Sequence, residues 1–327
     1  MHEVFFLPES SKFWKQTHYA WGVCLPEGSV YHYTPSVMAV KNILSTGELW
    51  MSKSTVMNDF TEINYGVDLF NDVVAGISDD TWLMNIVNLF SKDILGSFAD
   101  FFILSFSLNN NSRLLWDSYS NKNGYNIEFS KELISDFLAI SSDESNATLY
   151  DKVVSGQQGY NVAIKTYPEE CNPPKFRFLA FANSVSYNQD QQRIIINEII
   201  EYIRRYREYD FYTVFSDINM ALSSLMQSIL FFKHPSLRDE EEYRIVVKIM
   251  AEGEPIDKTY LRGVQQYREK DNKLLPYIVL KMKPLEYIKS LSVGYQNSNE
   301  LSISTMRDFI TTISPNIAIK TPYYPLR

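Results

Sequence analysis

Several polar side chains stand on segments that otherwise have the pattern of buried strands. His32 and Thr34 alternate with Tyr31 and Tyr33 in a β-branched and aromatic run, so they share one face of a predicted strand. The helix predicted directly after this strand would present free N–H groups at its N-terminus, which favour anions such as phosphate. A histidine beside such a helix is a candidate for chemistry with an anion, although a lone histidine is more often structural.

A second polar pair closes another predicted strand. Residues 101–107 (FFILSFS) are apolar and of strand length, and Ser105 and Ser107 share one face near the end of this run. Polar side chains at the ends of buried strands often line a cleft. The two serines are therefore candidate ligand-binding residues.

A third polar set lies on the predicted strand 241–249. The apolar residues of this strand alternate with a charged face that carries Glu242 and Arg244, and Glu240 continues that face just before the strand. A solvated Glu242–Arg244 pair on an edge strand would explain the charged face. A cleft in which one carboxylate faces His32 would explain it as well, and the pattern leaves both interpretations open.

The elements that must position these residues are clearest around His32. Thr34 is the expected N-cap of a helix with Pro35 at its first position, and Gly47 stands where a left-handed C-terminal cap is expected. Residues 48–52 are the next predicted strand. This order places His32 at the end of a strand and directly before a helix N-terminus.

The rest of the chain predicts one α+β domain over residues 1–327, without repeats or linkers. Residues 190–233 contain two successive helical patterns, so a helical insertion is expected there. Residues 150–154 have the composition of a short strand. Trp116 and Tyr119 are expected on a short helix, as partly buried supports of the site.

Composition excludes several classes of protein. Hydrophobic residues at 45% and aromatic residues at 14% are too frequent for a disordered chain. No run of about 18 apolar residues predicts a membrane span, and the N-terminal residues do not have the pattern of a secretory signal, so a cytoplasmic location is expected. The net charge of -8 argues against sequence-independent binding of duplex DNA.

The motifs resemble the bacterial family called domain of unknown function 2971. The resemblance is carried, in order, by residues 31–34, 43–52, 58–59 with Glu62, 105–107, 115–116 with Tyr119 and Gly124, and Glu240, Glu242, Tyr243 and Arg244. It extends over most of the chain. The name of that family implies no activity.

The opening of the chain is also similar to ADP-ribosyltransferase folds, including toxins that modify DNA and the RNA 2'-phosphotransferases. In those families a strand with His and Thr precedes a helix that ends in a glycine turn. The resemblance implies a mixed or antiparallel β core with flanking helices, NAD as substrate and an unidentified macromolecular acceptor. It implies NAD binding by His32, Tyr33, Thr34, Ser105 and Ser107, and catalysis by Glu242 or Glu240. A bacterial toxin or a phage-defence effector would suit this activity.

Two other functions are compatible with the same residues. His32 with Asp59, Glu62, Glu240 and Glu242 could hold a divalent ion for phosphodiester hydrolysis, but no tight ligand motif supports a metal site. A non-catalytic module that senses a nucleotide or binds a protein is the second alternative. All three depend first on whether His32 and the glutamates are neighbours in the fold.

Overall fold

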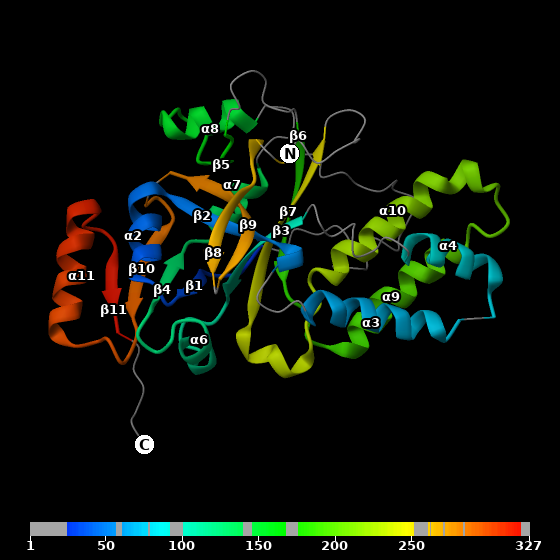
Figure 1. Ribbon diagram of the computed structural model, residues 1–327, viewed down its shortest axis with the longest axis horizontal. Helices are drawn as coiled ribbons and strands as arrows, with labels where there is room; N and C mark the ends of the chain where they lie inside the picture. The colour runs from blue at the N-terminus through cyan, green and yellow to red at the C-terminus, as the bar shows by residue number, and fades with distance from the viewer. Residues whose placement is uncertain are drawn as a thin grey trace.

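The structure of the protein, a computed structural model, describes most of the chain (Figure 1). The described residues are 25–56, 61–77, 79–91, 101–139, 146–167, 176–251, 261, 263–270, 272–283 and 285–321. Asp59 lies outside them, and so does the side chain of Glu62. In the described part of the chain, no helix combines the length and the apolar character needed to cross a membrane.

The fold is mixed α+β, with a large and mostly antiparallel open sheet. The described strands are β1 (Val30–Thr34), β2 (Glu48–Lys53), β3 (Phe101–Ser107), β4 (Tyr125–Phe129), β5 (Val162–Ile164), β6 (Phe176–Ser184), β7 (Glu242–Ala251), β8 (Gln266–Lys270), β9 (Lys273–Met282), β10 (Ile288–Val293) and β11 (Ala318–Lys320). Their order is β11-β10-β4-β1-β3-β2-β9-β5, and β7 pairs with β3, β6 with β7, and β8 with β9.

Helices lie on both sides of this sheet. They are α2 (Val37–Thr46), α3 (Thr61–Ala75), α4 (Thr81–Ser91), α6 (Arg113–Ser118), α7 (Glu132–Leu138), α8 (Asn146–Val154), α9 (Gln189–Arg204), α10 (Phe211–Ile229) and α11 (Glu300–Ile313), with the short 3₁₀ helices η1 (Ser54–Val56) and η3 (Pro235–Glu240). Figure 1 shows α3, α4, α9 and α10 gathered on one side of the molecule. The helices α9 and α10 occupy most of residues 190–233, and both pack against α3.

Strand β3 has three neighbours in the sheet, β1, β2 and β7. One edge of β3 pairs with β7 along its whole length, from Phe101 to Ser107. The other edge is shared, since β1 meets β3 at Ser107 and β2 meets it at Phe102 and Ile103. In the described structure no strand pairs with this edge over residues 104–106. The strands β1 and β2 therefore separate there and leave an opening in the sheet.

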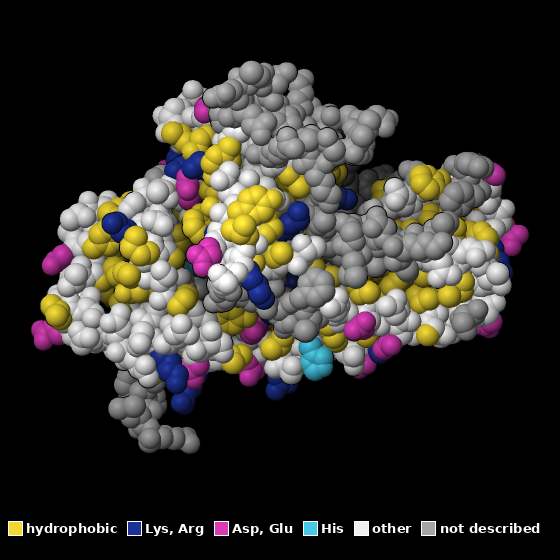
Figure 2. All heavy atoms as spheres, in the orientation of Figure 1, with side chains coloured by type: hydrophobic (Ala, Val, Ile, Leu, Met, Phe, Trp, Pro, Cys, Tyr) yellow, Lys and Arg dark blue, Asp and Glu magenta, His cyan; other side chains and the backbone are white. Residues whose placement is uncertain are grey.

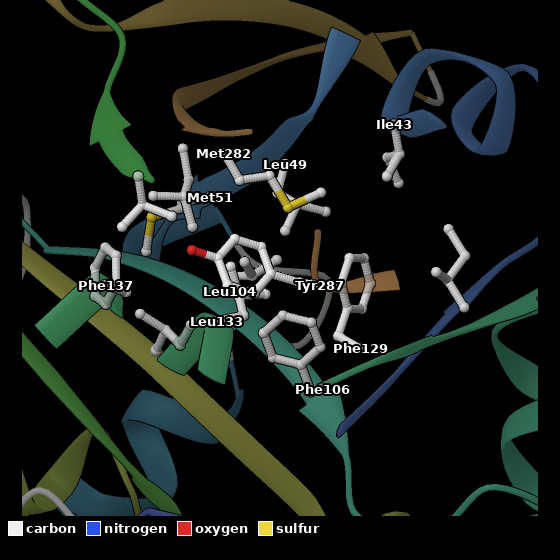
Figure 3. Close-up of a cluster of buried hydrophobic side chains, with 14 of the residues drawn as sticks. Ile43, Leu49, Met51, Leu104, Phe106, Phe129, Leu133, Phe137, Met282 and Tyr287 are labelled. Atoms are coloured by element: carbon white, nitrogen blue, oxygen red, sulfur yellow. The ribbon is translucent and has the colours of Figure 1, made fainter. Parts of the chain in front are cut away.

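The side chains of β3 alternate between two hydrophobic cores. Leu104 and Phe106 belong to the core that α2, α7 and α11 help to cover, and Figure 3 shows both side chains near Phe129 and Leu133. Ile103 points to the opposite core, formed mainly by α3, α4, α9 and α10. Because both faces are covered, β3 reads as an apolar run, and its serines occur only where the helical core ends.

Two local predictions need correction. The N-cap of α2 is Ser36, not Thr34, because the Ser36 hydroxyl accepts a hydrogen bond from the N–H of Ala39. Gly47 does provide the left-handed C-cap, with φ 66°. Residues 150–154 are helical within α8, because Leu149 and Val153 pack together as neighbours one turn apart in a small separate core.

The strand that carries Glu242 and Arg244, for which an edge position was one of two interpretations, is an interior strand. Strand β7 lies between β3 and β6, and Glu242 and Arg244 are both buried. The interpretation of their ion pair as a solvated surface pair is therefore wrong. Of this charged face, Glu242 lines the cavity at the opening beside β3.

Candidate functional site

A cavity of about 540 Å³ lies where β1 and β2 separate along β3. Its wall is made by β1, α2, β2 and β3, with single residues from η1, α6, η3, β7, β8 and β9. This volume is in the range of pockets that hold small molecules and cofactors. The opening in the sheet thus forms a site that segments from both halves of the chain complete.

The residues that the sequence predicts for the site converge on this cavity. His32, Tyr33, Thr34, Ser105, Ser107, Glu240 and Glu242 all line it. The structure thus brings the histidine, the two serines and both glutamates together around one cavity. The cross-strand register explains the convergence, because Ser107 stands opposite Glu242 and Ser105 stands opposite Arg244.

His32 bonds to the unpaired edge of β3. Its Nδ1 atom lies 3.4 Å from the carbonyl oxygen of Ser105, so Nδ1–H is the donor and Nε2 is left as an acceptor in the neutral ring. The ring also packs edge-to-face on Phe106. Burial lowers the pKa of His32, and the charge of Arg268 lowers it further, against the opposing effect of the Ser105 hydrogen bond. The site therefore favours a neutral imidazole.

The two glutamates belong to a buried cluster with two cations. Arg244 donates to both oxygens of Glu242, with Nε–Oε1 at 2.7 Å and Nη2–Oε2 at 2.9 Å. Lys233 lies 3.0 Å from Oε2 of Glu242 and also bonds to Oε2 of Glu240. The four side chains are each less than a tenth exposed. Buried charges of this kind require compensation, and the pairs provide it.

The cluster keeps Glu242 ionised. Burial alone would raise the pKa of Glu242, but the nearby charges of Arg244 and Lys233 outweigh burial and hold it well below its usual range. The Ser105 hydroxyl contributes in the same direction, although it makes no hydrogen bond of standard geometry. The Nη1 group of Arg244 donates to the carbonyl of Leu230 at 2.6 Å and so anchors the cluster to the end of α10.

Other side chains hold the wall in place. The Ser107 hydroxyl donates to the carbonyl of Glu240 at 2.8 Å and accepts from the N–H of Asn109, so it connects β3 to the segment before β7. The Tyr119 hydroxyl donates to Oε1 of Glu240 at 3.0 Å. Ser107 has its bonding capacity engaged by the protein, whereas Tyr119 reaches the carboxylate from the cavity wall.

Trp116 and Tyr119 have different positions. Trp116 is fully buried and packs edge-to-face on Tyr33, with ring centroids 5.2 Å apart. Tyr119 is 40% exposed and lines the cavity. Trp116 therefore supports the wall from behind, and only Tyr119 can touch a ligand.

Three lining residues, Lys233, Arg268 and Trp50, carry no distinct signal in the sequence. Lys233 directly follows a long helix, where a lysine normally serves the helix terminus in solvent. Arg268 and Trp50 lie on strands with mixed polarity. Their importance comes from the pairing of β2, β8 and β9, which no local pattern indicates.

The structure describes only some of the residues predicted as possible metal ligands. Asp59 and the side chain of Glu62 lie outside the described residues. Among the described residues, no group of three or more His, Cys, Asp or Glu side chains is placed to hold a metal ion. The carboxylates of Glu240 and Glu242 are instead bound by cationic side chains.

Comparison with known proteins gives one family model that matches part of the chain. Residues 115–245 match the family described as "Protein of unknown function (DUF2971)". The matched segment is less than half of the chain; it contains Lys233, Glu240 and Glu242 but not His32. No curated protein and no solved structure matches the chain. The match supports the resemblance to this family, whose description assigns no activity.

Proposed function

We propose that the protein binds NAD in this cavity and acts as an ADP-ribosyltransferase-like enzyme on a macromolecular acceptor, in the manner of a bacterial toxin or phage-defence effector. The observation that supports this most is the adjacency of three strands. His32, Ser105 and Glu242 lie on β1, β3 and β7, which are neighbours in that order around one cavity. The resemblance to ADP-ribosyltransferases implies this set of a histidine strand, a Ser-x-Ser strand and a glutamate strand.

The chemistry of the lining residues fits NAD cleavage. The bond between the ribose carbon and the nicotinamide nitrogen breaks, and nicotinamide leaves with the bonding electron pair as a neutral molecule. The ribose then carries oxocarbenium-like positive charge, which a nearby carboxylate stabilises more strongly than it stabilises the ground state. An oxygen or nitrogen of the acceptor bonds to this carbon and releases its proton to water or to the carboxylate. Neutral His32 offers Nε2 as an acceptor for a ribose hydroxyl.

The geometry favours Glu240 over Glu242 as the carboxylate that meets the ribose. A carboxylate has about four acceptor positions. Among the described residues, Glu242 uses three of them for Arg244 and Lys233, whereas Glu240 uses two, for Tyr119 and Lys233. In this proposal Glu242 positions Lys233 and Arg244, and Glu240 retains capacity for a ligand hydroxyl.

The test is to measure NAD binding by calorimetry and nicotinamide release by chromatography, with and without cell extract as a source of acceptor. Wild-type protein is expected to bind NAD and to release nicotinamide. Glu240→Gln is expected to bind NAD and to release much less. A wild-type protein that binds no NAD overturns the proposal.

A second candidate is a module that binds NAD without cleaving it. It is favoured by the charge balance of the cluster, in which two carboxylates face two cations and leave little net negative charge to stabilise an oxocarbenium ion. NAD binding without nicotinamide release, in the presence and absence of extract, would support this candidate over the enzyme.

A further inference from the structure

Arg268, on β8, lines the cavity and forms no ion pair with a carboxylate among the described residues. Its Nη2 donates to the Ser52 hydroxyl at 2.9 Å, and its Nε is buried and makes no hydrogen bond with any described residue. The other charged lining residues within the described structure are compensated, since Glu48 pairs with Lys165 and the remaining ones form the buried cluster. Arg268 therefore supplies the cavity with positive charge that no described acidic side chain neutralises.

Two aromatic rings orient the guanidinium group. Its central carbon lies 5.4 Å from the ring centroid of Trp50 and 5.8 Å from that of Tyr277. The two rings are themselves 4.6 Å apart. Such cation–π contacts hold the guanidinium plane without using any of its N–H donors. Figure 2 shows hydrophobic side chains beside Lys and Arg side chains near the centre of this face of the molecule.

Without a bound ligand, this arrangement of Arg268 reduces the stability of the folded protein. Burial lowers the pKa of Arg268, which means that the surroundings disfavour its charge. An unpaired Nε in a buried position also costs stability. Structural arginines in such places normally bond to a carboxylate or to backbone carbonyls. An oriented, partly desolvated guanidinium fork that is open to a cavity has the geometry to bind the paired oxygens of a phosphate.

We infer that Arg268 binds a phosphate group of the ligand, and that in NAD this group belongs to the pyrophosphate. The choice of a dinucleotide rests on the proposed function, whereas the phosphate chemistry rests on Arg268 itself. The site then has separate parts, with His32 and Glu240 for the ribose and Arg268 for the phosphate. A phosphate near Arg268 would also supply the negative charge that the described residues do not.

The experiment compares ligands with and without a pyrophosphate. Calorimetry measures the Kd of wild type and Arg268→Gln for NAD, ADP-ribose, nicotinamide riboside and inorganic pyrophosphate. In Arg268→Gln, loss of a hydrogen-bonded charge should raise the Kd for NAD and for ADP-ribose roughly 10- to 100-fold. The Kd for nicotinamide riboside, which has no phosphate, should rise by less than about threefold. Arg268→Lys keeps the charge but loses the fork, so an intermediate Kd is expected. Arg307→Gln, an exposed arginine on α11, is the control with the same change in net charge.

The outcomes separate this inference from the proposed function. If wild type binds pyrophosphate through Arg268 but binds neither NAD nor ADP-ribose, the phosphate site stands and the proposed function fails. If Arg268→Gln weakens the binding of nicotinamide riboside as much as the binding of NAD, Arg268 does not bind the phosphate and the inference fails. The inference also fails if the variant lowers the melting temperature of the ligand-free protein but leaves every Kd unchanged, because Arg268 is then structural. If wild type binds neither pyrophosphate nor any of the nucleotides, both fail.

Discussion

Glu242 and Arg244 lie two residues apart on β7 and form a buried, bidentate ion pair. Residues at this spacing share one face of a strand, so the pair is built by the strand itself. Lys233 extends the pair to Glu240 and so closes a network beside the cavity. The carboxylates of the candidate site are therefore part of the structure that holds β7 to the end of α10.

Glu242→Gln should lower the free energy of unfolding at pH 7 by about 3 to 5 kcal/mol, because it leaves the charges of Arg244 and Lys233 without their main partner. The native pKa of Glu242 is below its ordinary value of 4.5, so this stabilisation is present above pH 4.5 and is lost as the pH falls below it. The difference in the free energy of unfolding between wild type and variant should thus become smaller as the pH falls below 4.5. Denaturant unfolding from pH 7 to pH 3 measures this difference, and Glu269→Gln, at an exposed position, is the control with the same change in net charge.

Glu240→Gln should reduce the rate of nicotinamide release at saturating NAD by at least about tenfold, with little change in the Kd for NAD. The physical reason is that a carboxylate opposite developing positive charge acts in the transition state and only weakly in the ground state. Single-turnover kinetics together with calorimetry separate the two quantities. An equal loss of binding and of turnover would show that Glu240 binds the ground state and the transition state equally. An unchanged rate would show that Glu240 takes no part in the reaction.

His32→Ala should weaken NAD binding by about 1 to 3 kcal/mol, since it removes a hydrogen bond made in both the ground and the transition state. Binding should be measured by calorimetry at pH 7.5, where the imidazole is neutral. Turnover at saturating NAD need not change. An unaltered Kd would place His32 outside the ligand-binding residues.

The stability of the protein should also decrease as the pH falls below about 6.5, because the unfolded chain then takes up a proton that buried His32 resists. Above pH 6.5 His32 is neutral in both the folded and the unfolded protein, so this loss of stability is absent. His32→Gln should show a smaller decrease between pH 6.5 and pH 5 in denaturant unfolding. Parallel curves for wild type and variant would show that His32 does not titrate differently in the folded state.

Trp116→Ala should lower the free energy of unfolding by about 3 to 5 kcal/mol, as large aromatic truncations in cores do. The side chain is fully buried against Tyr33, so the loss should be structural. Trp116→Phe, which keeps part of the ring volume, should cost clearly less. Normal melting of Trp116→Ala combined with loss of NAD binding would instead give Trp116 a direct role in the site.

Gly124→Ala should destabilise the protein by about 1 to 3 kcal/mol or more, because the added methyl group overpacks a backbone contact. A Cβ atom at this position would lie 2.2 Å from the carbonyl oxygen of Thr34 and 2.7 Å from Cα of Pro35, at the corner between β1 and α2. Gly28→Ala is the matched control, since a Cβ there meets no atom within 4 Å. Thermal unfolding of both variants measures the difference, and equal melting temperatures would contradict the close approach.

Local features of the fold follow from the sequence alone. The strands around His32 and Ser105, the left-handed cap at Gly47 and the polar faces of β3 and β7 depend on residues within a few positions of one another. Alternation and capping are properties of such short segments, so they can be predicted without tertiary contacts. The sequence pattern could not distinguish Ser36 from Thr34 as the N-cap, because both residue types can cap a helix.

Tertiary structure alone decided how these segments combine. The separation of β1 and β2 along β3 creates the cavity, and it depends on strand pairs between residues that can be more than two hundred positions apart. The same contacts bury the Glu242–Arg244 pair and bring Arg268 beside Trp50. Burial and charge compensation are set by every element packed around a residue, whereas local periodicity records only its neighbours along the chain. For this reason the sequence could indicate candidate residues, but their environment required the assembled sheet.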